Sequence, residues 1–290
     1  MNTPKPTNLL PYNSYSLCAI AEQAYIPTNT SELEDALAST SSGASKVIVI
    51  GGGTNIILSK PYYDKRTCFI ITTSMDRYIH WNGCICTASS SVPLQALIQE
   101  SLDKKLKGLE KLAGIPGTVG GAIFMNAGAY GIDIHQHVLD VKTYDPTNKK
   151  YNIFSKEQLK SNYRSSIFQV NKEIIIEISF KLTPSNTPEC EAETAREILS
   201  RRNRTLPHIF PNAGSVFKRP ASGLRVGEIM EALGMKRFRI GGAMISDLHG
   251  GFIVNISQAN GCDIINLAEL MKKAAREKLN THLELEQIII

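Results

Sequence analysis

The sequence predicts an α+β fold in which a strand-rich first part is followed by a separate α/β layer. Between residues 68 and 90, three short strand-like segments are separated by turn residues, the spacing of an antiparallel sheet. After residue 190, helical and strand-like segments alternate, as they do in an α/β layer. A chain of 290 residues also exceeds what one hydrophobic core usually holds, so two or three domains are expected.

The predicted helices are marked by apolar periodicity and by signals at their ends. In the first predicted helix, residues 30–39, Ser31 and Glu34 have the spacing of a capping box. The second, residues 93–106, begins with a proline and has lysines near its end, as the helix dipole prefers. The residues before this first helix are expected to form a loop. Helices are expected at residues 30–39, 93–106, 191–204, 226–233 and 263–279.

Short apolar segments bounded by turn residues are expected to form strands. They lie at residues 47–50, 56–59, 68–74, 78–81, 84–90, 137–145, 173–182, 215–220, 251–257 and 283–290. In the last of them Glu284 and Glu286 alternate with apolar residues, which places both on one face. A Pro/Ser/Asn/Thr-rich linker at Thr183–Cys190 completes a predicted division into domains at 1–70, 71–185 and 186–290.

The composition is that of a globular protein, with 42% hydrophobic and 20% charged residues. No run of about 18 apolar residues and no N-terminal signal pattern is present, so no membrane association and a cytoplasmic location are expected. The six cysteines are scattered without a C-x-x-C motif, and the histidines form no H-E-x-x-H motif. No metal site is therefore expected, and His135–His137 is interpreted as the surface of a strand.

Three consecutive glycines open the segment Gly51–Asn55, between the strands at 47–50 and 56–59. Glycines free the backbone for positive φ and let several N–H groups converge on an anion. The segment is not a dinucleotide fingerprint, because a strand follows it rather than a helix, and it is not a P-loop, because no Gly-Lys-Ser/Thr follows. Two interpretations remain from the residues alone, a tight turn between buried strands and an anion-binding loop.

A second glycine-rich segment, Gly108–Gly131, has seven glycines in 24 residues and is nevertheless apolar. A flexible linker would be polar, so this segment is expected to be an ordered loop packed against something. Its small residues leave backbone amides accessible to a ligand. These residues are Gly117, Thr118, Gly120, Gly121 and Ala122.

The segment from Arg196 to Arg239 is strongly basic, with ten Lys or Arg residues and three Glu. Such a cluster favours a polyanion or a phosphorylated ligand. The segment lacks aromatic interleaving and recognisable nucleic-acid-binding modules. A small phosphorylated molecule is therefore expected as the partner, and nucleic acid is not.

Six motifs in order resemble the UDP-N-acetylenolpyruvoylglucosamine reductase family: "GGGTN", "GLEKLAGIPGTVGGAIFMNAGAYG", "YRSSIF", "NAGSVFKRP", "RIGGAMIS…GGFIVN" and "LELEQIII". The resemblance runs from about Ser31 to the end of the chain. It implies a two-part FAD-binding fold of the vanillyl-alcohol-oxidase (PCMH) type, with subdomains at 1–70 and 71–185, and a substrate-binding domain at 186–290. Neither glycine-rich loop contains a histidine that could link a flavin covalently, so the FAD is expected to be non-covalent.

The same resemblance implies a two-stage reaction of peptidoglycan precursor synthesis. NADPH would reduce the flavin, and flavin N5 would pass a hydride to C3 of the enolpyruvyl group of UDP-N-acetylenolpyruvoylglucosamine, giving UDP-N-acetylmuramate. The negative charge that develops needs a cation, an acid that holds the enol form and a proton donor at C2. By motif position these are Arg164, Glu286 and Ser215, with Glu284 as the alternative to Glu286.

The motifs also imply binding residues. The substrate would be bound by Tyr163, Lys218 and Arg219, the last two contacting the UDP pyrophosphate, because arginine is well shaped for bidentate phosphate contact. The arginines of the helix at 191–204 are interpreted as a solvated face. The cofactor-binding residues would be Gly51, Gly52, Gly53, Thr54, Asn55, Gly114, Pro116, Gly117, Thr118, Gly120, Gly121, Ala122 and Asn126.

The sequence departs from the family pattern in three places. "SLCAIAEQA" replaces an N-terminal Gly-Gly, only about 50 residues separate Arg164 from Ser215, and no basic residue follows Glu286. The short separation indicates the shorter, second type of the family, which lacks a substrate-capping insertion. Two rival functions remain open: a different flavoenzyme of the same fold, such as an alcohol or sugar oxidase, and a nucleotide-binding module without catalysis.

Overall fold

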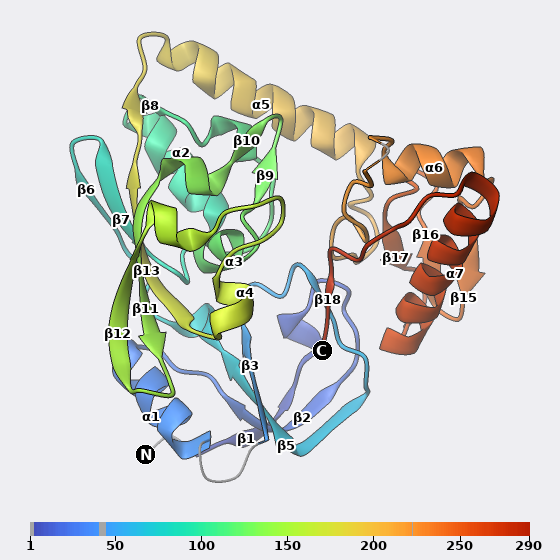
Figure 1. Ribbon diagram of the computed structural model, residues 1–290, viewed down its shortest axis with the longest axis horizontal. Coiled ribbons are helices and arrows are strands. Elements are labelled where there is room, and N and C mark those ends of the chain that lie inside the picture. The colour runs from blue at the N-terminus through green and yellow to red at the C-terminus, as the bar shows by residue number, and fades with distance from the viewer. Residues whose placement is uncertain (1–2, 41–44, 222) are drawn as a thin grey trace. The chain divides into compact units, whose positions relative to one another are not determined.

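The computed structural model describes residues 3–40, 45–221 and 223–290 (Figure 1). The chain divides into two compact units. The first consists mainly of Tyr25–Gly52 and Ile70–Arg202, and the second of Lys5–Ala24, Gly53–Phe69 and Asn203–Ile290. This division differs from the domain boundaries expected at residues 70 and 185, which remain a prediction.

A five-stranded antiparallel sheet forms the centre of the first unit, in the order β12-β11-β13-β7-β6. Its strands are β6 (Ile79–Asn82), β7 (Ile85–Ser89), β11 (Val138–Asp145), β12 (Lys150–Ser155) and β13 (Ile174–Lys181). The first unit also contains β3 (Lys46–Ile50), β8 (Leu106–Lys107), β9 (Gly128–Ala129), β10 (Ile132–Asp133), β14 (Thr183–Pro184) and the one-turn helix α4 (Phe168–Asn171).

Both faces of this sheet are covered by helices. One core joins apolar side chains of α2 (Leu94–Asp103) and α3 (Val119–Phe124) to β7, β11 and β13. The other joins Leu33 and Leu37 of α1 (Thr30–Thr40) to residues of β11 and β13. The pairing of β11 with β13 skips Ile176, and such a bulge changes which face the following side chains point to. Alternation along β13 supplies both cores, and the bulge places Ile178 and Phe180 on the face of Ile175 rather than on that of Ile174 and Ile176.

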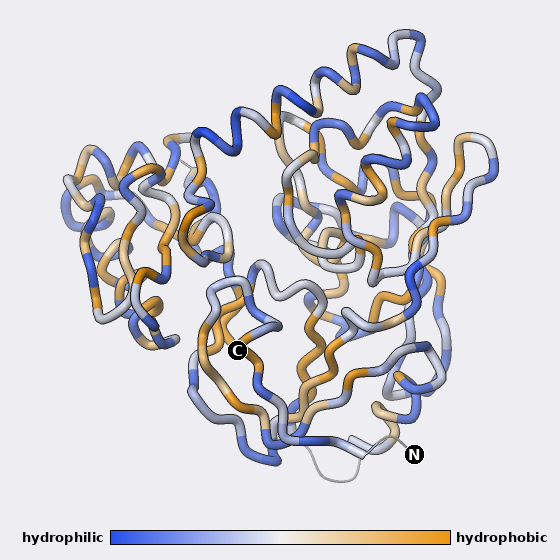
Figure 2. The backbone as a smooth tube through the Cα atoms, turned by 180° about the vertical axis from the view of Figure 1, so that it is seen from behind, coloured by the Kyte–Doolittle hydropathy of each residue, from blue (hydrophilic) through white to orange (hydrophobic). Residues whose placement is uncertain are grey.

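The long helix α5 (Pro188–Thr205) follows the sheet. Figure 2 shows it coloured mostly hydrophilic, with short hydrophobic stretches along its length. Ala195 and Ile198 are its buried residues, and they pack with Ala113 of the second glycine-rich loop. The apolar stripe of α5 is therefore narrow, which leaves most of its charged side chains exposed to solvent.

The second unit contains β1 (Lys5–Asn8), β2 (Ile20–Tyr25) and most of β5 (Tyr62–Ile71), which are neighbours in one sheet. Its C-terminal part holds α6 (Val226–Ala232), α7 (Gly261–Leu279) and the sheet β15 (Arg239–Ile240), β16 (Ala243–Ile245) and β17 (Ile253–Asn255). Asn260 caps α7 by accepting a hydrogen bond from the Asp263 amide. At the end of the chain, β18 (Ile288–Ile289) runs parallel to β4 (Ile56–Ile57).

All five predicted helices are present, whereas several local predictions are wrong. The N-terminal loop contains β1 and β2, and α1 is capped by Asn29, which accepts from the Glu32 amide, rather than by Ser31 and Glu34. The segment at 215–220 makes single bridges instead of a continuous strand, and the strands β12, β15 and β16 were not expected. The final strand comprises only Ile288–Ile289, so Glu284 and Glu286 precede it.

Candidate active site

Gly51 and Gly52, the part of the first glycine-rich loop that belongs to the first unit, lie against the second loop. A Cβ atom at Gly51 would be 2.9 Å from Thr118 Oγ1, and one at Gly52 would be 3.0 Å from the Cα of Gly117. Cβ atoms are rarely found so close to backbone, so this approach requires glycine in the first loop. The second loop was expected to be an ordered loop packed against another part of the protein. That part is the triple-glycine turn of the first loop.

Helix α3 begins in the second loop, and its N-terminal amides already have acceptors. The Val119 amide donates to Val92 O and the Gly120 amide to Ser90 O, while the Gly121 amide donates to the capping Thr118 Oγ1 at 3.3 Å. These three N–H groups are therefore engaged by the protein.

Gly121 differs from the other glycines of this loop. It is exposed, it lies inside a helix, and the nearest described atom to a Cβ there would be Thr118 Oγ1 at 3.5 Å, an ordinary contact distance. A glycine inside a helix costs about 1 kcal/mol relative to alanine. Packing within the described residues does not require a glycine at position 121. A flat ligand lying on this surface of the helix would require one, because a side chain would keep the ligand away from the backbone.

Other glycines of the predicted cofactor site are needed for packing. At Gly114, with φ +79°, a Cβ would lie 2.7 Å from Cδ and Nε of Arg202. Arg202 is only partly exposed and packs against Gly114, so it does not belong to the solvated face that was expected for the arginines of this helix. Burial lowers the pKa of Arg202 from its usual range. At Gly53, with φ +62°, a Cβ would lie 2.0 Å from Tyr12 O in the second unit.

Arg164 lies in a tight turn of the first unit. The amides and carbonyls of Asn162 and Ser165 pair with each other, and Arg164 between them has φ +53°, in the left-handed region that most side chains avoid. Its Nη2 donates to Gly128 O at 2.9 Å, and its guanidinium lies 5.0 Å from the centre of the Tyr163 ring. The strained turn holds the predicted cationic residue in a defined position.

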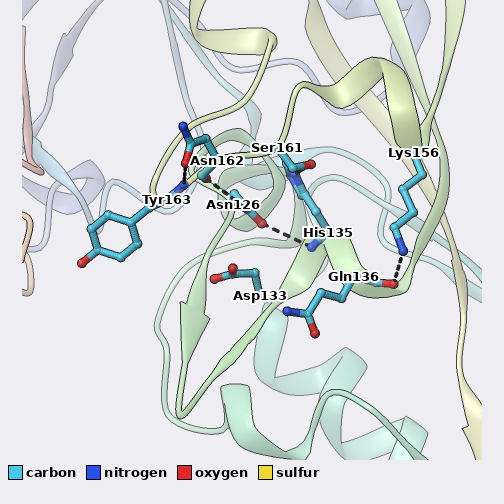
Figure 3. Close-up of a pocket in the computed structure, with 8 residues that line it drawn as sticks. All are labelled: Asn126, Asp133, His135, Gln136, Lys156, Ser161, Asn162 and Tyr163. Carbon is cyan, nitrogen blue, oxygen red and sulfur yellow. Dashed lines mark hydrogen bonds between the residues drawn. The ribbon is translucent and has the colours of Figure 1, made fainter.

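A cavity of about 330 Å³ lies beside this turn, and its lining includes the predicted residues Asn126 and Tyr163 (Figure 3). Asn126 is 2% exposed and donates to Asn162 O at 3.0 Å, while its side-chain oxygen accepts from the His135 amide. The Asn126 side chain thus connects parts of the protein. Its main-chain N–H is engaged as well, donating to Ile123 O at 3.1 Å.

His135 supports the same turn. It was expected on the surface of a strand, and that prediction is wrong. It lies in the 3-10 helix Ile134–His137, is 2% exposed, and places Nε2 2.8 Å from Ile123 O and Nδ1 2.7 Å from Ser161 Oγ. A carbonyl only accepts, so Nε2 carries the proton and Nδ1 accepts from Ser161. Burial lowers the pKa of His135, an effect that its bond to Ile123 and the nearby Asp133 oppose.

Ser215 and Glu286 are brought together in the second unit. Ser215 is exposed and forms a bridge with Phe252, and the Glu286 amide donates to Val216 O at 2.9 Å. Asn55 Nδ2 donates to Glu286 O at 3.1 Å, and Asn55 O accepts from the Ile288 amide at 3.0 Å. The end of the first glycine loop therefore holds the main chain of the predicted catalytic acid.

The predicted pyrophosphate contacts follow Ser215 on the same segment. The Lys218 amide donates to Glu284 O, and its Nζ lies 2.6 Å from Glu284 Oε1. Glu284 thus pairs with a lysine, whereas Glu286, two residues later, is the acid beside the Ser215 segment. Arg219 is exposed. The basic segment is further balanced by pairs of Arg225 with Glu228, Lys236 with Glu231 and Arg237 with Asp247.

Sequence reasoning missed two groups of supporting residues. One is His135 and Asn162 beside the Arg164 turn. The other is Tyr15 and Gln287, both buried in the second unit and hydrogen-bonded to each other at 2.9 Å. The available signal was the glutamine itself, a polar residue between Glu286 and three isoleucines at the end of the chain.

Neither a metal site nor a membrane span is found among the described residues. Within residues 3–40, 45–221 and 223–290, no three His, Cys, Asp or Glu side chains are grouped so that they could hold a metal ion. Over the same ranges, the helices lack the combination of length and apolar character that crossing a membrane requires.

Comparison with known proteins agrees with this fold. A family model described as "FAD binding domain" matches residues 21–151. A second, described as "UDP-N-acetylenolpyruvoylglucosamine reductase, C-terminal domain", matches residues 206–290. The protein is accordingly a flavoprotein with a two-part FAD-binding fold and a C-terminal α/β domain, and it is a flavin-dependent oxidoreductase.

Named relatives and a solved structure define the family. The chain is 38% identical over 280 residues to the UDP-N-acetylenolpyruvoylglucosamine reductase of Francisella tularensis, covering 96% of this chain and 97% of the relative. It is 32% identical to that of Alkaliphilus oremlandii, over 96% and 90% of the two chains. The crystal structure of the Thermus caldophilus reductase matches with a TM-score of 0.82 and 26% identity, over 100% and 99%. This chain belongs to the UDP-N-acetylenolpyruvoylglucosamine reductase family.

Proposed function

We propose that this protein reduces UDP-N-acetylenolpyruvoylglucosamine to UDP-N-acetylmuramate in the cytoplasm, with FAD as its cofactor and NADPH as the hydride donor. The observation that supports this most directly is the arrangement of Ser215 and Glu286. An exposed hydroxyl and a carboxyl group lie on adjacent extended segments of the second unit. Asn55 of the GGGTN loop also binds the Glu286 main chain, which links this pair to a predicted cofactor loop.

FAD would be held by the residues of the two glycine-rich loops. Gly51 and Gly52 bring the loops into contact, and Gly121 leaves an open surface on α3. The residues present therefore fit a flat cofactor with a pyrophosphate. When bound, FAD would supply hydride transfer from NADPH to C3 of the enolpyruvyl group.

Ser215 is proposed to donate the proton that C2 receives. A serine hydroxyl is a weak acid, so it is a plausible donor only toward a strongly basic carbanion, which this substrate would provide. Glu286 is proposed to hold the enol form of the substrate carboxylate by donating a hydrogen bond. Arg164 is proposed to stabilise the negative charge on the same carboxylate, a role that suits a permanently charged guanidinium.

Substrate binding is assigned to Tyr163, Lys218 and Arg219. Lys218 already pairs with Glu284, so its contact with a pyrophosphate would be made in competition with that carboxylate. Arg219 is exposed, and its guanidinium has the shape for a bidentate phosphate contact.

The test uses the purified protein with its bound flavin, under anaerobic conditions. NADPH should bleach the oxidised-flavin absorbance, and subsequent addition of UDP-N-acetylenolpyruvoylglucosamine should restore it with formation of UDP-N-acetylmuramate. A flavin that stays reduced after the substrate is added would refute the proposed reaction. A sugar or an alcohol that reduces the oxidised flavin directly would instead identify an oxidase.

A further inference from the structure

The side chain of Gln287 connects the two segments that carry Ser215 and Glu286. Its Nε2 donates to Ala213 O at 3.0 Å and to Gly214 O at 3.2 Å, and its Oε1 accepts from the Tyr15 hydroxyl at 2.9 Å. Gln287 directly follows Glu286, and Gly214 directly precedes Ser215. The side chain of the residue after Glu286 therefore binds the main chain of the residue before Ser215.

The orientation of this amide is determined by its partners. The two carbonyl groups of Ala213 and Gly214 only accept, so the NH₂ end of Gln287 must face them. Its oxygen then faces Tyr15, whose hydroxyl must donate. A rotated amide would place its oxygen against two carbonyl oxygens, so the observed orientation is the only one that satisfies all three partners.

The network is buried. Gln287 is 4% exposed, Ala213 is 2% exposed and Tyr15 is fully buried. Burial raises the pKa of the Tyr15 hydroxyl well above its usual range, so it stays protonated and remains a donor. Because a buried polar group left without a partner is costly, each member of the network constrains the others.

Tyr15 is itself held at its main chain. Its carbonyl oxygen accepts from the side-chain Nδ2 of Asn255 at 2.8 Å, and the main-chain N–H of Asn255 donates to Pro211 O at 2.9 Å. Pro211 lies four residues before Ser215. Tyr15 is thus connected to the loop that precedes Ser215 in two ways. Its hydroxyl is connected through Gln287, and its main chain through Asn255.

The loop between Pro211 and Ser215 needs such support. Gly214 has φ +78° and its amide donates to Asn212 Oδ1 at 3.1 Å; apart from Gly214 and its two chain neighbours, no described atom lies within 4 Å of where its Cβ would be. Packing by the described residues on this side does not hold the glycine in place, so its carbonyl bond to Gln287 supplies a restraint that packing does not.

We propose that Gln287, oriented by Tyr15, is a positioning residue that sets the location of Ser215 relative to Glu286 for the protonation step. This inference rests on the proposed function. Gln287 does not contact the substrate in this role. It acts through the main chain on either side of the two proposed catalytic residues, and an error of about 1 Å in such positions can cost on the order of 10²-fold in rate.

The test measures two half-reactions on the flavin-loaded protein. Gln287→Met removes the amide at nearly constant volume. Reduction of the flavin by NADPH should stay within about twofold of wild type, whereas reoxidation by UDP-N-acetylenolpyruvoylglucosamine should slow by at least about tenfold. If this variant does not fold, Gln287→Asn replaces it, because its amide is one methylene too short for all three partners, and the same result is expected.

A double variant separates positioning from stability. In Gln287→Met the Tyr15 hydroxyl loses its buried acceptor, and adding Tyr15→Phe removes that unpaired hydroxyl. The double variant should therefore regain part of the lost melting temperature while its reoxidation stays slow. Reoxidation that recovers together with the melting temperature would show a merely structural role and overturn the inference.

Tyr63→Phe is the matched control. Tyr63 is a buried tyrosine whose hydroxyl donates at 2.9 Å to the carbonyl oxygen of Ile290, three residues after Gln287. It should lower the melting temperature without slowing reoxidation. If Gln287→Met is reoxidised as fast as the wild-type protein, the positioning role is overturned and the proposed function is not. If the reduced flavin of the wild-type protein is not reoxidised by the substrate, the proposed function is refuted, and this inference with it.

Discussion

Asn55 holds the main chain around Glu286 at two points: its Nδ2 donates to Glu286 O at 3.1 Å, and its carbonyl oxygen accepts from the Ile288 amide at 3.0 Å. Asn55 and Glu286 are separated by 231 positions in the sequence. Asn55 ends the triple-glycine loop, and Glu286 is the proposed catalytic acid. The parallel pairing of β18 with β4 thus connects a proposed cofactor loop to a proposed catalytic residue through the backbone.

Ser215→Ala tests the proton donor. Reduction of the flavin by NADPH should remain nearly intact, because the hydroxyl has no part in it, while reoxidation by the substrate should slow by about 10²-fold or more. Anaerobic stopped-flow absorbance of the flavin measures both steps separately. An equal loss in both half-reactions would count against Ser215 as the donor.

Gly121→Ala tests whether FAD lies on α3. The structure has room for the added Cβ, and alanine favours a helix by about 1 kcal/mol over glycine. We expect an apoprotein at least as stable as wild type, with at least about tenfold weaker FAD binding in a flavin-fluorescence titration. The contrasting variant is Gly120→Ala, whose Cβ would be 2.7 Å from Ser90 Cβ and should destabilise the apoprotein itself. Unchanged FAD affinity in Gly121→Ala would place the cofactor elsewhere.

Lys218→Met tests the pyrophosphate contact. Loss of a charge-assisted bond to the substrate should raise its KM by about tenfold with little change in kcat. Lys272→Met is the matched control, because Lys272 is also a partly buried lysine that pairs with a glutamate, Glu269, at 2.7 Å. Steady-state kinetics should show no KM change for the control. An effect of equal size in both variants would indicate a general loss of charge rather than a contact.

The stability of the folded chain should depend on pH through His135. Burial lowers the pKa of this histidine, so below about pH 6.5 the unfolded chain binds more protons than the folded one. Stability is then fully present above this pH and decreases as the pH falls toward the folded-state pKa. Burial acts in the same direction on His137 and His249.

Urea unfolding at a series of pH values measures this effect. His135→Gln should be less stable than wild type at neutral pH, because its amide cannot reproduce both ring hydrogen bonds. It should also lose less stability on acidification. A slope equal to that of wild type would mean that His135 does not contribute to the acid sensitivity.

The sequence alone determined the class of fold, the helices and the two glycine-rich loops. These features depend on local signals, namely apolar periodicity, end residues and glycine content. The order of the motifs also indicates Arg164, Ser215 and Glu286 as candidate catalytic residues. The segments misassigned from the sequence, such as β1 and β2 in the expected N-terminal loop, are short strands whose formation depends on partners far away in the chain.

Only the tertiary structure showed how distant residues support the site. Gly52 is required by the approach of Gly117, and Asn126 and His135 brace the Arg164 turn. The pairing of Tyr15 with Gln287 spans 272 positions and could not be inferred from local pattern. Hydrogen bonds between buried side chains and backbone depend on which segments meet in space, and a single sequence carries no direct record of that.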